Sequence, residues 1–141
     1  MVSANRLYKI ASVLLILFTL GHTYGFLNFR PPSPEGRAVF DSMNGVYFHV
    51  KGTTLSYGGF YRGFGLAISI YGLFMAYLTW HLGTLAESSP QAIGLLGWGL
   101  FLMQVAMLIL SLQYFAIVPS VLSGLLAILL AAAAWSVRGR A

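Results

Sequence analysis

The chain has 141 residues, of which 58% are hydrophobic and only 8% are charged, and its formal net charge is +5. A soluble domain would carry about a quarter charged residues, so this composition excludes an ordinary soluble domain. The basic residues are scattered and mostly flank apolar segments, which predicts no nucleic-acid partner. The chain has no cysteine, which excludes disulfides, thiolate catalysis and thiolate-held metal or iron–sulfur sites.

Four apolar segments, each about long enough to cross a bilayer, fill most of the chain. The predicted transmembrane helices cover about 8–29, 55–85, 91–113 and 118–137. None of these segments contains an acidic residue. The sequence therefore predicts an all-α fold: an integral membrane, four-helix antiparallel bundle formed as one domain over residues 1–141. An amphipathic extramembrane segment, residues 30–54, joins the first two helices.

The first apolar segment resembles a signal peptide because Arg6 and Lys9 precede it. Its apolar core is longer than a usual signal-peptide core, and it ends in Arg30-Pro31-Pro32 rather than in a small-residue cleavage site. We therefore expect a retained helix that stops where the two prolines prevent helical hydrogen bonding.

The extramembrane segment begins with a helix-start pattern. Ser33-Pro34-Glu35 places a capping residue, a proline and an acid in the order that the first turn of a helix prefers. An apolar stripe at helical spacing follows: Val39, Phe40, Met43, Val46, Tyr47 and Val50. This predicts an amphipathic helix over Pro34–Met43. Residues 46–51 also alternate in polarity, so helix and short strand are equally favoured there.

The boundaries of the later helices follow from caps and length. Thr53, Thr54 and Ser56 are candidate caps for the second membrane helix. Residues 91–137 are almost unbroken apolar sequence, and one helix of that length would span about 70 Å, too long for a bilayer. The segment must fold back, and Pro119 is predicted to mark the turn.

Two polar residues interrupt the membrane helices. His22 and Arg62 each lie about 10 Å inside the end of their helix, and antiparallel packing brings them to a similar depth. Both side chains are predicted to point into the bundle, within roughly 6 Å of each other, because unpaired polar groups in hydrocarbon are costly. G-x-x-x-G motifs at 21–25 and 59–63 predict a close helix contact beside them. In the alternatives, Arg62 extends to the interface and His22 binds a backbone carbonyl or a hydroxyl.

Four further residues complete the candidate ligand-binding set. Tyr61 and Gln104 lie at depths similar to those of His22 and Arg62. For a glutamine in a membrane helix, a hydrogen bond that joins two helices is commoner than ligand binding. Glu35 and Asp41 are the acids that can reach the outer cluster if their helix folds over it as a lid. A carboxylate would then pair with Arg62, whereas in the alternative both acids stay solvated.

No metal or cofactor site is predicted. Metal-ligand spacing such as H-x-x-x-H is absent from the sequence, as are a serine elbow and a phosphate-binding loop. His81 follows Trp80 at the opposite membrane face, as in an aromatic interface belt, so His22 and His81 do not form a bis-histidine haem site.

Orientation follows from the basic residues near the helix ends. With four spans both termini share one side, which carries Arg6, Lys9, Arg138 and Arg140. We expect that side to be cytoplasmic and the membrane to be a bacterial inner membrane.

The chain resembles small bacterial four-helix membrane proteins of the DoxX-like and other, uncharacterised kinds. The likeness covers length, helix number and the polar first helix pair, including Gly21-His22 and Arg62-Gly63-Phe64-Gly65. It implies a compact antiparallel bundle and supplies no chemistry to transfer. Small multidrug exporters share the size, but they depend on an acid inside the first helix, which this chain lacks.

The leading functional prediction is a binding protein. It would hold a lipid-like or hydrophobic small molecule in the outer half of the bundle, with His22 and Arg62 at the polar head. Its partners would be membrane lipid, a hydrophobic ligand, and either a homo-oligomer or a larger membrane complex. One alternative is an accessory structural subunit of such a complex. The other is a membrane enzyme acting on a lipid or isoprenoid, with His22 as acid–base assisted by Glu35 or Asp41.

Overall fold

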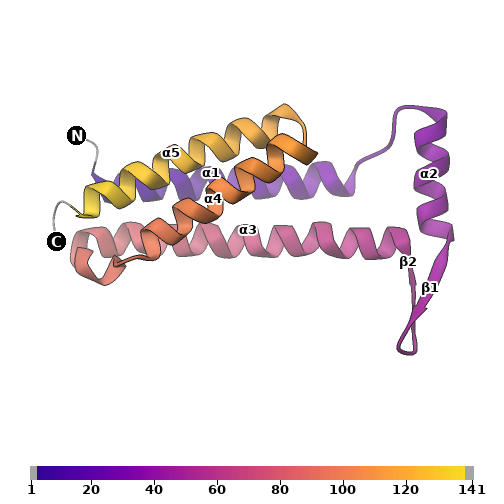
Figure 1. Ribbon diagram of the computed structural model, residues 1–141, viewed down its shortest axis with the longest axis horizontal. Helices are drawn as coiled ribbons and strands as arrows, with labels where there is room; N and C mark the ends of the chain where they lie inside the picture. The colour runs from indigo at the N-terminus through magenta and orange to yellow at the C-terminus, as the bar shows by residue number, and fades with distance from the viewer. Residues whose placement is uncertain (1–2, 139–141) are drawn as a thin grey trace. The chain divides into compact units, whose positions relative to one another are not determined.

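The computed structural model describes residues 3–138, and the chain is mostly helical, at 83%. In chain order the elements are α1 (Ala4–Leu27), α2 (Pro34–Gly45), β1 (Tyr47–Val50), β2 (Thr53–Ser56), α3 (Tyr57–Ser88), the 3-10 helix η1 (Pro90–Ile93), α4 (Leu96–Tyr114) and α5 (Ile117–Arg138) (Figure 1). Four of the helices within residues 3–138 are long and apolar enough to cross a membrane: α1, α3, α4 and α5. The predicted four apolar helices are confirmed, and they are compatible with an integral membrane protein.

The described residues group into two compact units. The terminal unit comprises residues 3–19 and 72–138, and the central unit comprises Leu20–Tyr71. Both α1 and α3 contribute residues to each unit. The terminal unit also contains η1, α4 and α5, whereas the central unit contains α2 and the two strands.

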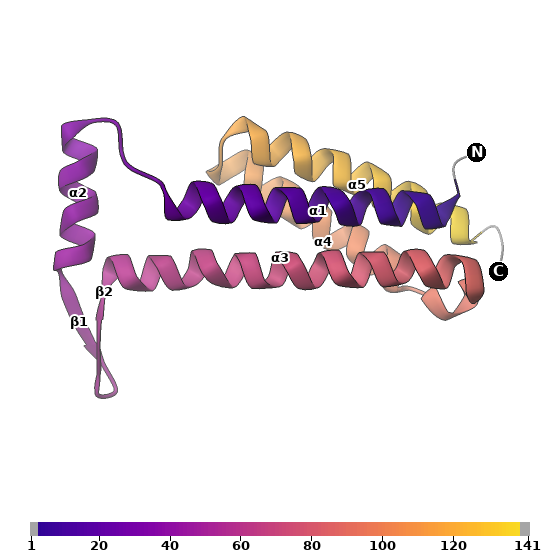
Figure 2. The same cartoon turned by 180° about the vertical axis from the view of Figure 1, so that it is seen from behind.

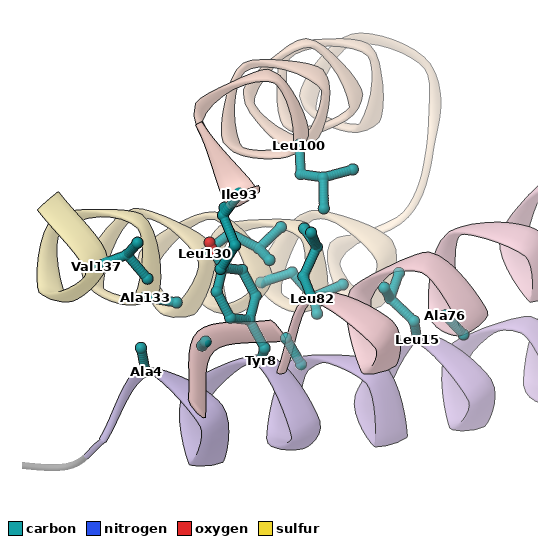
Figure 3. Packing of buried hydrophobic residues seen from close by; sticks show 13 residues of the cluster. Ala4, Tyr8, Leu15, Ala76, Leu82, Ile93, Leu100, Leu130, Ala133 and Val137 are labelled. Carbon is teal, nitrogen blue, oxygen red and sulfur yellow. The ribbon is translucent and has the colours of Figure 1, made fainter. Parts of the chain in front are cut away.

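The core of the terminal unit surrounds Tyr8, which is fully buried. Figure 3 shows its ring among Ile93, Leu82 and Leu130, which come from η1, α3 and α5. The remaining members of this hydrophobic cluster come from α1, α3, α4 and α5: Ala4, Ala11, Leu15, Ala76, Ala86, Leu100, Leu126, Ala133 and Val137. Many of these side chains are alanines, so the helices approach closely there.

Within the terminal unit, α1 and α3 pack through small residues and hydrogen bonds (Figure 2). The Asn5 side-chain amide donates to the Gly83 carbonyl at 2.9 Å, and the Ser12 hydroxyl donates to the Ala76 carbonyl at 2.7 Å. Close packing and interhelical hydrogen bonds are the contacts that hold helices together in a bilayer, because lipid is as apolar as leucine.

The connection between α4 and α5 is a tight turn. Helix α4 ends at Tyr114 and α5 begins at Ile117, so Phe115 and Ala116 form the turn. The predicted fold-back is present, but the prediction that Pro119 marks it is wrong, because Pro119 lies in the first turn of α5. The first four N–H groups of a helix have no intrahelical acceptor, so a proline there costs no hydrogen bond.

In the central unit, α2 begins as its sequence predicts. Ser33 is the N-cap, its side chain accepts a hydrogen bond from the Gly36 N–H at 3.0 Å, and Pro34 opens the first turn. The helix extends two residues beyond the predicted Met43, to Gly45.

A β-hairpin follows α2 and decides the open assignment of residues 46–51 in favour of a strand. Strands β1 and β2 are antiparallel, with Val50 opposite Thr53. Lys51 and Gly52 both have positive φ, 44° and 82°, as a two-residue type I′ turn requires. The all-α prediction therefore needs this one correction. Ser56 caps α3 by accepting from the Gly59 N–H at 3.0 Å, whereas the other two predicted caps lie on β2.

Candidate functional site

Five of the six predicted site residues lie in the central unit. His22 is on α1, Glu35 and Asp41 are on α2, and Tyr61 and Arg62 are on α3. The sixth, Gln104, is buried on α4 in the terminal unit.

His22 joins α1 to α3 through a backbone contact. Its Nε2 lies 3.2 Å from the Gly65 carbonyl oxygen, and because a carbonyl only accepts, Nε2 is the donor. The imidazole also stacks on Phe26, with ring centroids 5.7 Å apart. A contact of His22 with a backbone carbonyl was the alternative prediction for this residue.

A second polar contact lies beside it. The Thr23 hydroxyl donates to Ser69 Oγ at 2.7 Å, and Ser69 Oγ donates to the Gly65 carbonyl at 3.3 Å. The Gly65 carbonyl thus accepts from both His22 and Ser69. This network fastens the C-terminal end of α1 to α3 in the central unit.

The glycines that allow close packing around α3 in the central unit differ from the predicted ones. A Cβ at Gly21, Gly25 or Gly63 would meet nothing within 4 Å, so the predicted contact between the G-x-x-x-G motifs is wrong. A Cβ at Gly65 would instead collide with the ring of Phe26, and one at Gly58 would collide with Asn44. Gly65 therefore packs against α1, whereas Gly58 packs against α2.

A small pocket of about 80 Å³ opens where α1 ends and α3 begins. Its walls come from α1, from the residues that follow it, from α2 and from α3: Phe26, Leu27, Phe29, Arg30, Phe40, Met43, Asn44, Gly58, Tyr61 and Arg62. We call this the central pocket. Tyr61 and Arg62, two of the predicted site residues, both line it, and both are exposed.

Aromatic side chains form much of the central pocket. The Phe26 and Tyr61 rings lie 5.3 Å apart, and Phe29 meets Phe40 of α2 edge-on at 6.5 Å. Helix α2, which was expected from the sequence to act as a lid, forms part of the pocket wall through Phe40 and Met43. Because these rings pack on one another, the pocket has an apolar wall with guanidinium groups beside it.

The other predicted site residues do not line the central pocket. Glu35 and Asp41 are exposed on α2 and are not part of its wall. His22 is half-buried against Gly65 and is also outside the wall. Arg30, in contrast, lines the pocket although the sequence indicated only a flanking anchor. No sequence signal marked Arg30, because an arginine that flanks an apolar helix is ordinary.

The terminal unit holds a larger open cleft of about 630 Å³. It lies among η1, the start of α4 and the end of α5, with Ile93, Leu95, Trp98 and Val137 among its apolar walls and Arg138 at its edge. This cleft was not predicted from the sequence, because most of its lining residues are apolar and resemble the rest of the apolar helices.

Within residues 3–138, no three His, Asp or Glu side chains are grouped so as to hold a metal ion. Comparison of the chain with protein-family models, with curated proteins and with solved structures finds no match.

Proposed function

We propose that the chain is an integral membrane protein that binds a lipid-like molecule in the central pocket, with the polar head of the ligand at Arg62. The observation that carries this proposal is the combination of an aromatic wall with an accessible guanidinium in one pocket. A hydrophobic small molecule with a polar head fits both features.

The position of the central pocket along the helices supports a lipid-like ligand. Helix α1 ends at Leu27 and α3 begins at Tyr57, so the pocket lies at the end of two apolar helices, where headgroups and water meet. Aromatic and basic side chains are favoured at that level of a bilayer. Its volume of about 80 Å³ is several times the roughly 10–15 Å³ that one water needs. It therefore accommodates a headgroup, while the apolar chains extend along the exposed helix faces.

Native mass spectrometry of the full chain from a mild non-ionic detergent tests this proposal. The parent protein is expected to retain a lipid-sized adduct. Leu27→Trp should remove the adduct, because Leu27 lines the pocket and a larger ring fills it. The matched control is Leu20→Trp, which alters an exposed leucine on the same helix outside the pocket. An adduct that is absent from the parent, or that survives Leu27→Trp unchanged, would overturn the proposal.

We further infer that the four apolar helices form an antiparallel membrane bundle with both termini in the cytoplasm of a bacterial cell. The support is a small excess of basic residues on the side of the termini. That side carries Arg6, Lys9, Arg138 and Arg140, whereas the segment between α1 and α3 carries Arg30, Arg37 and Lys51. The central pocket would then face outward.

Cysteine labelling gives a clear expectation for this orientation, because the natural chain has no cysteine. Ser33→Cys should react in intact cells with an impermeant thiol reagent, since Ser33 caps the exposed helix α2. Ser88→Cys, at the end of α3, should react only after the cells are opened. The reverse pattern would place the termini outside and the central pocket at the inner leaflet.

The terminal cleft supports a second candidate function, an accessory subunit of a larger membrane complex. Leu95 and Trp98 line an apolar opening of about 630 Å³, large enough to accept side chains of a partner helix, and Leu95 is 84% exposed. In that case the same mass spectra should show a second polypeptide that Leu95→Arg releases. An enzymatic role is not proposed, because neither His22 nor a carboxylate lines the central pocket.

A further inference from the structure

We propose that the central pocket selects lipids with an anionic headgroup, and that Arg30 and Arg62 together hold the headgroup. This inference rests on the proposed lipid binding and names the class of ligand. The shared chemistry is a phosphate or carboxylate group, and the bilayer location commits the proposal to a lipid as its source.

The residues that line the central pocket give it a positive charge. Two guanidinium-bearing residues line it, Arg30 and Arg62, and no carboxylate is among its lining residues. Both arginines are exposed, so an incoming headgroup can reach either of them. A pocket with two positive charges and no negative one attracts an anion.

The geometry of the side chains points the same way. A guanidinium presents a planar set of donors that matches two oxygens of a phosphate or carboxylate at once. The two arginines reach the pocket from different segments, Arg30 from the link that follows α1 and Arg62 from the second turn of α3. One anion between them would therefore be held from two directions, while the rings of Phe26, Phe29 and Tyr61 cover the first carbons of the lipid.

The competing role for these arginines is to neutralise the carbonyl end of α1, which has no basic residue in its last turn. That end is already partly satisfied by neighbouring groups. The Tyr24 carbonyl accepts from the Asn28 N–H at 3.1 Å and from the Asn28 side-chain amide at 2.8 Å. The Phe26 carbonyl accepts from the Phe29 N–H at 3.5 Å. The Tyr24 and Phe26 carbonyls thus have partners without the guanidinium groups, which leaves the arginine donors available to a ligand.

Competition between two lipids tests the inference. The detergent-purified full chain is incubated with equal amounts of phosphatidylglycerol and phosphatidylcholine of identical acyl chains, and retained lipid is read by native mass spectrometry. A basic residue near an anionic surface contributes about 1 kcal/mol, a factor of about five in affinity. Arg30→Gln and Arg62→Gln are therefore each expected to lower the preference for phosphatidylglycerol about fivefold, with phosphatidylcholine retention unchanged. Added salt should lower the preference as well.

Arg37→Gln is the matched control. It removes the same charge from α2, where Arg37 is exposed and outside the pocket wall, and the preference should persist. Equal retention of the two lipids, or an equal effect of Arg37→Gln, would overturn the anion inference while leaving lipid binding intact. Retention of neither lipid would instead reject the proposed function itself. In a separate arm, inorganic phosphate alone is titrated. If the lipid-free protein binds phosphate and the lipids do not compete with it, the site is for a soluble anion and the lipid assignment is wrong.

Discussion

Replacing Tyr8 by alanine is expected to lower the free energy of unfolding by about 3 kcal/mol. Tyr8 is the largest fully buried side chain in the described part of the chain, and four elements of the terminal unit pack around it. Its removal leaves a cavity, and the van der Waals contacts of the ring with its neighbours are lost. Reversible unfolding in mixed micelles would measure the change.

Tyr8→Phe is the control that separates packing from hydrogen bonding. Among residues 3–138, the Tyr8 hydroxyl has no hydrogen-bond partner and lies against Gly97. A buried hydroxyl without a partner carries a desolvation cost of about 1–3 kcal/mol, so phenylalanine should match or exceed the stability of the parent. If Tyr8→Phe destabilised as much as Tyr8→Ala, the ring packing would not be the source of the effect.

A second large effect is expected at Gly72 on α3. A Cβ there would collide with the hydroxyl of Thr19 and lie 3.2 Å from its methyl carbon. Thr19 is buried and donates to the Leu15 carbonyl at 2.7 Å, so it has little freedom to move. Overpacking costs about 1–3 kcal/mol, and alanine regains up to about 1 kcal/mol of helix propensity. Gly72→Ala should therefore destabilise by up to about 2 kcal/mol.

Gly63→Ala is the matched control on the same helix. A Cβ at Gly63 meets nothing within 4 Å, so only the propensity gain remains and stability should stay equal or rise. The two variants distinguish the observed contact of Gly72 with Thr19 from the contact that the G-x-x-x-G motif predicted at Gly63. If Gly63→Ala destabilised and Gly72→Ala did not, the helix contact of the G-x-x-x-G type would be correct after all.

The helices were predictable because their signals are local. An apolar run of bilayer length has few alternatives to a helix, and the Ser33 cap is decided within one turn. The hairpin was left open because residues 46–51 fit both a helical apolar stripe and an alternation of polarity. Its turn also requires a positive φ at Lys51, which is uncommon for a residue with a side chain. The Lys51-Gly52 pair between two strand-like runs was the available signal, but it is weaker than Asn-Gly.

The packing between helices was less predictable than the helices themselves. Glycine spacing alone does not say which face meets a neighbour, so the motifs at 21–25 and 59–63 pointed to open faces. The contact is made instead by Gly65 under Phe26 and by Gly72 against Thr19. Those pairs depend on the register of two helices far apart in sequence, which one sequence without its structure does not reveal.

The candidate site was predictable only in part, because the sequence marks polar residues within apolar helices but does not show which of them meet. A charge within an apolar helix marked Arg62 and its neighbour Tyr61, and both line the central pocket. His22 was marked by the same rule, but it contacts the Gly65 carbonyl. Arg30 lies outside the helices, where an arginine is ordinary, and only the ends of α1 and α3 meeting at one pocket reveal its role.

Lipid binding in the central pocket is tested most directly by photo-crosslinking. The purified full chain is mixed with a phosphatidylglycerol that carries a diazirine close to its headgroup, irradiated, and digested for peptide mapping. The labelled peptides should contain the pocket walls, 26–30, 40–44 and 58–62, and excess unlabelled phosphatidylglycerol should suppress that labelling. Labelling spread over the exposed faces of α3, α4 and α5, with no suppression by unlabelled lipid, would contradict a binding site in the central pocket.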